Sequence, residues 1–213
     1  IEPNKMLRRL RSDLLRAKLT KIEQIGTERI AYFTFTNFEK ELTLIVEFFG
    51  DGNIILCNEE RKILALLHSI DVRHRQLRVG LEYTPPPEDG LDVLNLTKES
   101  FRQLFSTSGI GKTIGRGLGL PKKYVEEIIR LSGIDPKKPS NEVTNEEFEA
   151  LYEIITSTLS KVTQGPHDPS VIIEDDVHDA YPIRFSDDNL NAKKVNSFNE
   201  GLDIVFTEEI LEK

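Results

Sequence analysis

Residues 106–113 end in the way that a phosphate-binding P-loop ends. The segment runs from Ser106 to Thr113 and closes with Gly-Lys-Thr. A P-loop also needs a glycine at its first position and a buried strand before it. Here Ser106 takes that position, and an amphipathic helical pattern precedes it. The sequence therefore argues against nucleotide hydrolysis at this segment.

The same segment offers a second chemistry, which is binding of a nucleic-acid phosphate. Gly109 and Gly111 lie between two short predicted helices, where small residues let a ligand approach backbone N–H groups at a helix start. Four neighbouring side chains would add positive charge: Lys112, Arg116, Lys122 and Lys123. A tight turn under a solvated basic surface explains the same residues, so both interpretations stay open.

Glu28 and Arg29 form another candidate site, in a turn that starts at Gly26 and leads into a predicted strand. A carboxylate beside an arginine can orient the guanidinium and leave its other donors for a phosphate or a base edge. Two solvated turn charges are the simpler explanation when these residues are taken alone.

Residues 73–78, Arg-His-Arg-Gln-Leu-Arg, make a further basic cluster near the end of the predicted sheet. A solvated edge strand explains this cluster as well as a nucleic-acid contact does, because charge on an edge strand discourages aggregation.

The sequence contains no catalytic or metal-binding constellation. The acidic run at 174–179 lacks the spaced oxygens and central glycine of a calcium loop, and the 4 histidines are scattered. Cys57 is the single cysteine, which excludes an internal disulfide and a cysteine-based zinc site. We therefore expect no catalytic residue, no metal and no cofactor, and a binding protein instead of an enzyme.

The first third of the chain predicts a helix followed by a sheet. Asn4 is a plausible N-cap for an amphipathic helix over 4–19, whose arginines, Arg8 and Arg9 among them, lie off the leucine stripe. The period then changes to two, which predicts strands at 30–36, 42–49, 53–57 and 63–68. Short breaks between the strands predict an antiparallel meander from about 20 to 84, and the proline-rich run that follows ends it.

The middle and last thirds predict short helices and then a small mixed unit. Thr97 can cap a helix to about 105; a turn at 108–111 leads to a helix ending near 117; Pro121 opens a helix that stops at Gly133. Thr144 and Glu147 form a capping box for the next helix. Strands at 171–173 and 181–185, an exposed polar loop at 186–196 and a last helix from Ser197 follow.

Composition leaves a nucleic-acid partner possible despite a net charge of −8 over 213 residues. The deficit lies in 166–213, whereas residues 1–29 hold 8 basic against 4 acidic side chains and residues 98–138 hold 9 against 4. Only local charge matters at a phosphate contact. No apolar run is long enough for a membrane span, and the single cysteine fits a reducing, cytoplasmic setting. The start without Met or an apolar leader suggests a fragment.

Several motifs together resemble the NFACT family, which includes RqcH and NEMF and whose bacterial members were once called fibronectin-binding proteins. The resemblance covers nearly the whole chain in consistent order. The matching segments are 3–11 (Pro-Asn-Lys-Met-Leu-Arg-Arg-Leu-Arg), 19–30, 44–56, 179–183 and 198–203.

The resemblance implies a role in ribosome-associated quality control. Such proteins bind the large ribosomal subunit after a stalled ribosome splits, beside the peptidyl-tRNA and its nascent chain. They recruit tRNA, typically alanyl-tRNA, for untemplated tailing of that chain. The family places an Asp-Arg pair for tRNA recruitment in a Gly-x-Asp-Arg-Ile motif, and Glu28 and Arg29 stand at that pair here, the acid being one methylene longer.

A remoter resemblance concerns residues 119–136, which are similar to the helix-two-turn-helix segment of formamidopyrimidine-DNA glycosylases. Those enzymes need an N-terminal proline nucleophile and usually a four-cysteine zinc finger, whereas this chain begins Ile-Glu-Pro and has one cysteine. The resemblance therefore implies surviving nucleic-acid-binding helices without base excision.

We thus expect an α+β protein of three parts. Residues 1–85 would form an antiparallel sheet domain truncated at its N-terminus, 91–165 a helix-hairpin-helix domain, and 166–213 a small strand and helix unit that leads into a coiled coil. The expected tRNA contacts are Glu28, Arg29, Arg8 and Arg9. A DNA-binding or repair protein and a protein-interaction scaffold are the alternative functions.

Overall fold

The computed structural model describes residues 4–38, 40–87, 91–174 and 177–211. The chain divides into two compact units, Ile1–Asp92 and Val93–Lys213. The described residues have the predicted α+β fold, with antiparallel sheets and separate helices. The finer division at 85, 91 and 165 into three domains stays a prediction.

The first helix, α1 (Lys5–Leu14), begins as the sequence predicts. The Asn4 side chain accepts a hydrogen bond of 2.8 Å from the backbone N–H of Leu7, as an N-cap should. The helix is shorter than the predicted 4–19, because Leu15 is extended and Arg16 has a φ of 72°. Met6 is buried on the apolar side of α1.

The first unit contains the predicted antiparallel meander. Its strands are β1 (Lys18–Gln24), β2 (Ile30–Asn37), β3 (Lys40–Glu47), β4 (Asn53–Cys57) and β5 (Ile63–Leu66). Each strand pairs with the next in chain order, so β1 lies at an edge. Alternate residues from neighbouring strands, such as Ile30, Ile45 and Ile55, are buried together on one face.

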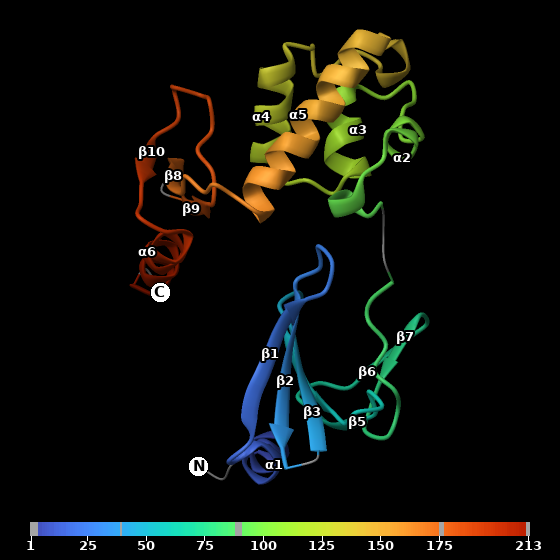
Figure 1. Ribbon diagram of the computed structural model, residues 1–213, viewed down its shortest axis with the longest axis vertical. Coiled ribbons are helices and arrows are strands. Elements are labelled where there is room, and N and C mark those ends of the chain that lie inside the picture. Colours follow the sequence, from blue (N-terminus) through green and yellow to red (C-terminus); the bar gives the residue numbers. More distant parts are fainter. Residues whose placement is uncertain (1–3, 39, 88–90, 175–176, 212–213) are drawn as a thin grey trace. The chain divides into compact units, whose positions relative to one another are not determined.

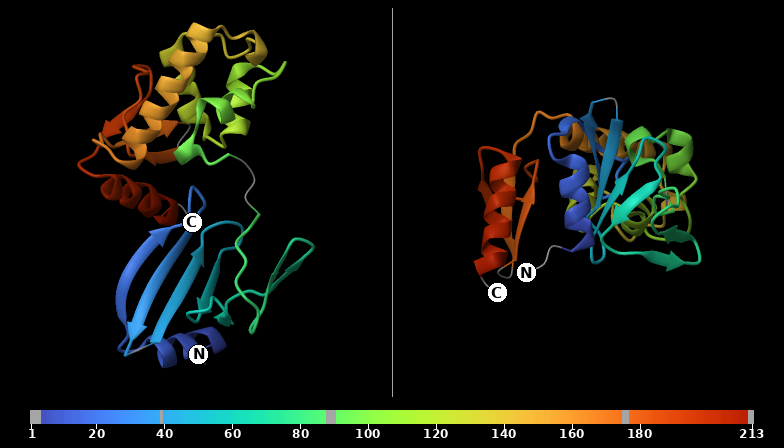
Figure 2. Two further views of the ribbon diagram at one scale, coloured as in Figure 1. Left: turned by 45° about the vertical axis from the view of Figure 1, so that its right-hand side comes forward. Right: turned by 90° about the horizontal axis from the view of Figure 1, so that it is seen from below.

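The sheet core is completed by chain that follows β5. A two-stranded hairpin of β6 (Ile70–Val72) and β7 (Arg75–Leu77) extends away from the β1–β5 sheet (Figure 2, left). Leu77 and Tyr83 nevertheless pack into the same buried cluster as the sheet residues. The hairpin base is therefore anchored in the core.

The two ends of the sheet carry different features. Helix α1 lies at the end where β2 turns into β3, and the turn from β1 to β2 lies at the opposite end (Figure 1). Because a strand rises about 3.3 Å per residue, the length of β1 separates these ends by about 20 Å.

The second unit begins with helices. Its α-helices before the next strands are α2 (Lys98–Arg102), α3 (Ile110–Gly117), α4 (Lys122–Ser132) and α5 (Asn145–Thr163), with 3-10 turns at Val93–Asn95 and Ser140–Glu142. The predicted caps are confirmed at Thr97, at Gly133 with φ 67°, and at the Thr144 capping box. The predicted turn at 108–111 is too long, because α3 already starts at Ile110.

The C-terminal part of this unit is a small sheet with a helix. Strands β8 (Ser170–Glu174), β9 (Val177–Tyr181) and β10 (Ala192–Lys194) lie in the order β10-β8-β9, and α6 (Phe198–Leu211) packs against them through Val205. The predicted strand at 181–185 is wrong beyond Tyr181, and the predicted loop at 186–196 contains β10. None of the described helices could cross a membrane.

Candidate nucleic-acid interface

The turn that carries Glu28 and Arg29 joins β1 to β2 and is held by its backbone. The Ile25 N–H donates to the Ile30 carbonyl oxygen at 3.1 Å. The Glu28 N–H donates to the Ile25 carbonyl oxygen, also at 3.1 Å. The Arg29 carbonyl accepts a bond of 2.8 Å from the Phe48 N–H of the next turn. Gly26 has a φ of 55°, the left-handed region that glycine adopts at little cost.

Arg29 is exposed on this fixed turn and makes no ion pair with any described residue. Glu28 is half-buried, and no hydrogen bond or ion pair links it to Arg29, so the prediction that Glu28 orients the guanidinium is wrong here. The backbone of the turn positions Arg29 instead. No described residue accepts a hydrogen bond from its guanidinium.

Helix α1 and the start of β1 form a strongly cationic surface. Arg9 donates through Nε to Asp13 at 2.5 Å, which neutralises it. The other cations here are exposed and, within the described chain, make no ion pair: Lys5, Arg8, Arg11, Arg16 and Lys18. Of the two predicted α1 contacts, Arg8 is therefore the better placed for a phosphate.

The predicted tRNA residues do not form one patch. Arg8 lies on α1 at one end of the sheet, and Arg29 lies on the turn at the other end (Figure 1). A separation of about 20 Å exceeds the screening length of about 8–10 Å at physiological salt. The two sites must therefore act on separate parts of any ligand.

Two N–H groups of the glycine turn before α3 are already used within the protein. The Ile110 N–H donates to the Lys138 carbonyl oxygen at 2.8 Å, and the Gly111 N–H donates to that of Pro136 at 3.0 Å. A Cβ on Gly109 would stand 2.8 Å from the Pro136 oxygen. Both glycines thus serve close packing of α3 on the 136–138 loop.

The cations near this turn differ in their availability. Lys112 and Arg116 are exposed and unpaired with respect to the described residues. Lys122 is largely exposed, with Glu126 3.5 Å from its Nζ. Lys123 is mostly buried and donates to Glu174 at 2.6 Å, a hydrogen bond that raises its pKa. Lys123 is therefore a weak candidate for RNA.

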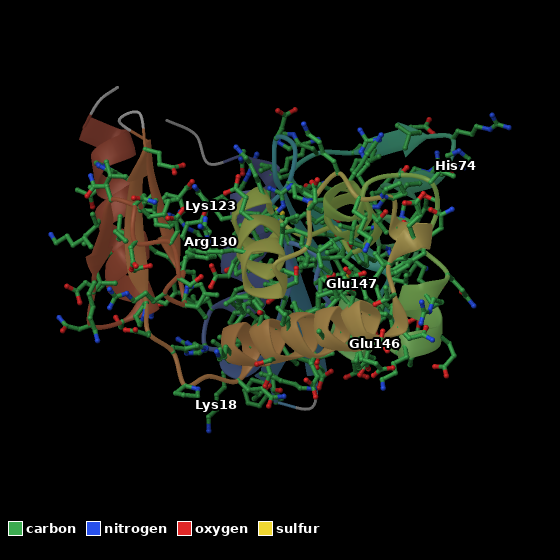
Figure 3. The ribbon with its side chains drawn as sticks, turned by 90° about the horizontal axis from the view of Figure 1, so that it is seen from above. Lys18, His74, Lys123, Arg130, Glu146 and Glu147 are labelled. Atoms are coloured by element: carbon green, nitrogen blue, oxygen red, sulfur yellow. The ribbon has the colours of Figure 1, made fainter. Side chains whose placement is uncertain are left out.

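A cleft of about 590 Å³ lies between α4 and the C-terminal strands. It does not favour a polyanion, because its cations are paired with acidic side chains. Lys123 and Arg130 lie on the side of α4 that faces those strands (Figure 3). Arg130 pairs with Asp187 at 2.6 Å, as Lys123 does with Glu174. The buried Glu127 carboxylate also accepts from the Ser186 N–H and hydroxyl, each at 3.0 Å. These ion pairs and hydrogen bonds hold α4 and the C-terminal strands together within one unit.

A buried ion pair joins Glu47 and Arg75, and the sequence motifs did not predict it. The sequence leaves the 73–78 cluster open between a solvated edge strand and a nucleic-acid contact, but the Arg75 guanidinium is buried and donates to both carboxylate oxygens of Glu47. The Tyr83 hydroxyl donates to Glu47 at 2.9 Å, and the Arg75 Nε donates to the Thr84 carbonyl at 2.8 Å. Burial, and then Glu47, raise the pKa of the Tyr83 phenol far above its ordinary value.

The strand period contained a signal for this pair. Thr43, Ile45 and Glu47 alternate along β3 and are all buried, so an acid occupies an inward position. A buried carboxylate needs a partner. The alternation of Arg75 with Leu77 in β7 offers one.

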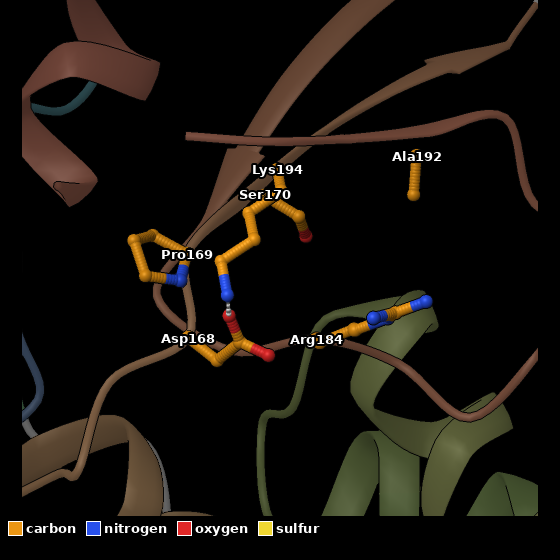
Figure 4. A pocket seen from close by; sticks show the side chains of 6 residues that line it. All are labelled: Asp168, Pro169, Ser170, Arg184, Ala192 and Lys194. Carbon is orange, nitrogen blue, oxygen red and sulfur yellow. Dashed lines mark ion pairs between the residues drawn. The ribbon is translucent and has the colours of Figure 1, made fainter. Parts of the chain in front are cut away.

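Two further features carry no chemistry of their own. A small cavity of about 90 Å³ beside β8 is bridged by an ion pair of 3.1 Å between Lys194 and Asp168 (Figure 4). Cys57 is fully buried, and burial raises the pKa of its thiol to about 11. In the parts of the chain that the structure describes, no three His, Cys, Asp or Glu side chains are grouped to hold a metal.

Comparison with known proteins gives one family over the whole chain. A family model described as NFACT N-terminal and middle domains matches residues 1–213. The chain is 32% identical over 205 residues to the archaeal Rqc2 homolog aRqcH of Methanocaldococcus jannaschii, covering 92% of this chain and 30% of that protein. It is 32% identical over 102 residues to ribosome quality control complex subunit 2 of Schizosaccharomyces pombe, covering 45% of this chain and 9% of that protein.

A solved structure shares the fold. The N-terminal part of the fibronectin/fibrinogen-binding protein from Streptococcus suis matches with a TM-score of 0.70 at 22% identity, over 98% of this chain and 74% of that one. At this identity the likeness concerns the fold alone. The chain spans less than a third of the length of the archaeal relative.

Proposed function

The chain belongs to the NFACT family of ribosome quality control proteins, and from this premise we propose that it is a tRNA- and large-ribosomal-subunit-binding module. In this proposal the whole protein recruits tRNA, alanyl-tRNA in the first instance, to large subunits that still carry peptidyl-tRNA. The tailing chemistry belongs to the ribosome, so the module itself is not an enzyme and needs no cofactor. It would act in the cytoplasm.

The observation that carries the proposal is the state of Arg29. The family motif for tRNA recruitment falls on Glu28 and Arg29, and the structure presents Arg29 exposed, unpaired within the described chain and on a turn fixed by backbone hydrogen bonds. The fixed backbone positions the start of the Arg29 side chain, and the planar donors of its guanidinium suit a phosphate or a base edge.

Helix α1 would supply the second contact. A folded tRNA is long enough to reach both ends of the β1–β5 sheet, so a gap of about 20 Å does not prevent Arg8 and Arg29 from touching one molecule. Arg9, paired with Asp13, would contribute less than Arg8.

The helices of 91–165 would bind rRNA backbone in the manner of a helix-two-turn-helix domain. The contacts would come from side chains, with Lys112, Arg116 and Lys122 exposed at the α3–α4 surface. The N–H groups of Ile110 and Gly111 are already used within the protein and are not part of the proposal.

Replacing Glu28 and Arg29 together by Ala in the full-length protein tests the assignment. The change leaves net charge unaltered, and we expect loss of tRNA association with an unchanged circular dichroism spectrum. The matched control is Lys21→Ala with Glu23→Ala, which removes an exposed ion pair of 2.8 Å from the same hairpin. Retained tRNA binding by the Glu28/Arg29 variant at equal salt would refute the assignment.

The same protein distinguishes the alternatives. A DNA-repair enzyme would show glycosylase or lyase turnover on damaged duplex. A protein-interaction scaffold would show no salt-dependent affinity for RNA. We expect neither result.

A further inference from the structure

The β6–β7 hairpin ends in two exposed polar residues that the fold does not require. Arg73 and His74 form the turn between the two strands, and His74 lies at the outer end of the hairpin (Figure 3). A two-residue hairpin turn favours Asn, Asp or Gly, so the turn geometry does not explain these side chains. Protection of a strand edge does not explain them either, because both residues lie outside the paired positions of β6 and β7.

The backbone of the hairpin is fixed close to this turn. Arg75, which stands opposite Val72 at the start of β7, is buried and bonded to the Glu47 carboxylate. Its Nε also donates to the Thr84 carbonyl oxygen at 2.8 Å. Arg73 is two residues from this buried anchor. The hairpin therefore presents its turn at a defined place on the first unit.

The anchor places the hairpin at the same end of the sheet as Arg29. Glu47 is the last residue of β3 and stands opposite Ile30, the residue that follows Arg29. Arg75 reaches this same Glu47 from the hairpin. Arg29 and the hairpin therefore border one end of the first unit.

The hairpin lies in a cationic part of the chain. Residues 61–84 hold 5 basic and 2 acidic side chains. One of these acids, Glu82, stands opposite Lys62 in an isolated β-bridge. Arg73 is exposed and makes no ion pair among the residues that the structure describes. Its charge is therefore not neutralised within the described chain, and local charge is what a phosphate meets.

An open hollow of about 380 Å³ lies beside the turn. Its lining includes Arg73, His74 and Gln76, together with the carboxylate of Glu82. Guanidinium, imidazole and amide groups all offer N–H donors, which suit the oxygens of a phosphate. Leu81 is the one apolar side chain in this lining, so an apolar ligand would find little to pack against.

We infer that the β6–β7 hairpin binds the sugar–phosphate backbone of RNA, with Arg73 as the principal contact and His74 and Gln76 as further donors. The inference rests on the proposed function, since it presumes that the protein binds RNA, and it adds a contact outside the recruitment motif. RNA fits better than an acidic protein surface, because phosphates recur along its backbone and so meet both the hairpin and Arg29 at one end of the unit. The backbone is that of tRNA or of large-subunit rRNA.

The test measures the affinity of the full-length protein for purified tRNA, for protein-free large-subunit rRNA and for intact large subunits, each over a series of salt concentrations. Arg73→Ala should weaken binding of tRNA or of the free rRNA about 5- to 8-fold at 0.1 M salt. The salt slope should fall by about 0.7–0.9, which is the contribution of one phosphate contact. Arg73→Lys should keep the slope, because a lysine still contacts a phosphate.

The matched control is Arg184→Ala, which removes another exposed arginine that makes no ion pair with any described residue. Arg184 lies in the acidic part of the chain, 166–213, and its loss should change neither affinity nor slope.

Each outcome decides one question. Weaker binding of tRNA assigns the hairpin to tRNA, and weaker binding of free rRNA assigns it to the large subunit; either result supports the inference. The inference is overturned if Arg73→Ala binds both RNA probes as the unaltered protein does. It is overturned in the same way if only intact subunits bind more weakly, because the hairpin then contacts a ribosomal protein. A loss of affinity with an unchanged salt slope also contradicts it.

Failure of the proposed function looks different from failure of the inference. If the unaltered protein binds neither tRNA nor rRNA, the proposed function fails and the inference fails with it. If the Glu28/Arg29 variant loses tRNA while Arg73→Ala binds both RNA probes normally, the inference alone is overturned.

Discussion

Replacing Glu47 by Ala should destabilise the first unit by about 3–5 kcal/mol. Glu47 and Arg75 are both buried, and the substitution leaves the Arg75 guanidinium in the core with only the Thr84 carbonyl and the Tyr83 hydroxyl as partners. An uncompensated buried charge of this kind carries that penalty. The free energy of unfolding is measured by urea titration, with hydrogen exchange of β2–β4 amides reporting on this unit.

Two comparisons make the Glu47 prediction specific. Glu149→Ala breaks an exposed pair with Lys98, whose side chain is 50% exposed, and should cost at most about 1 kcal/mol. Glu47→Leu combined with Arg75→Met removes both charges and should return stability to within about 1 kcal/mol of the original. The reasoning is refuted if Glu47→Ala costs no more than Glu149→Ala, or if the double variant is as unstable as the single one.

Three further predictions concern other buried positions. The Cys57 thiol should not react with a disulfide reagent in the native state; because folding favours its neutral form, its contribution to stability holds below about pH 9 and is lost as pH rises toward 11, which alkaline denaturation can follow. Gly109→Ala should cost about 1–3 kcal/mol by overpacking against a backbone oxygen. Gly115→Ala should be neutral or stabilising in thermal unfolding, because its Cβ would make an ordinary contact of 3.5 Å with the Val125 Cγ2. Glu127→Ala leaves the Ser186 N–H without its acceptor and should cost about 1–3 kcal/mol, with faster hydrogen exchange at residues 182–195.

Local signals in the sequence predicted most element boundaries. Asn4, Thr97 and Thr144 each start a helix because their side chains bond to backbone only three residues ahead. Gly133 ends α4 because it alone adopts the left-handed conformation there without strain. These interactions depend on adjacent residues and can therefore be read from the chain.

Edge and tertiary features were harder to predict. Strand β1 has almost no buried position, so it carries no period-two pattern, and its first residues were assigned to the preceding helix. The N–H groups of Ile110 and Gly111 donate to carbonyls that lie 28 and 25 residues further along the chain, a contact that no local spacing reveals. Glu47 and Arg75 are likewise 28 residues apart.

In the candidate site, too, local motifs were readable from the sequence and the tertiary placement was not. Arg8 and Arg29 were identified from motifs, but their placement at opposite ends of one sheet follows from the meander. The net charge of −8 does not decide for or against RNA, because only local charge matters at a phosphate contact.

The most direct test of the account is the salt dependence of tRNA binding by the full-length protein. Because phosphate contacts release counterions, we expect log affinity to fall linearly with log salt, with a slope that decreases by about 0.7–0.9 for each cation removed. Arg29→Ala and Arg8→Ala should reduce the slope additively, since they lie about 20 Å apart. A protein that binds tRNA with no salt dependence, or whose slope is the same in both variants as in the original, would contradict it.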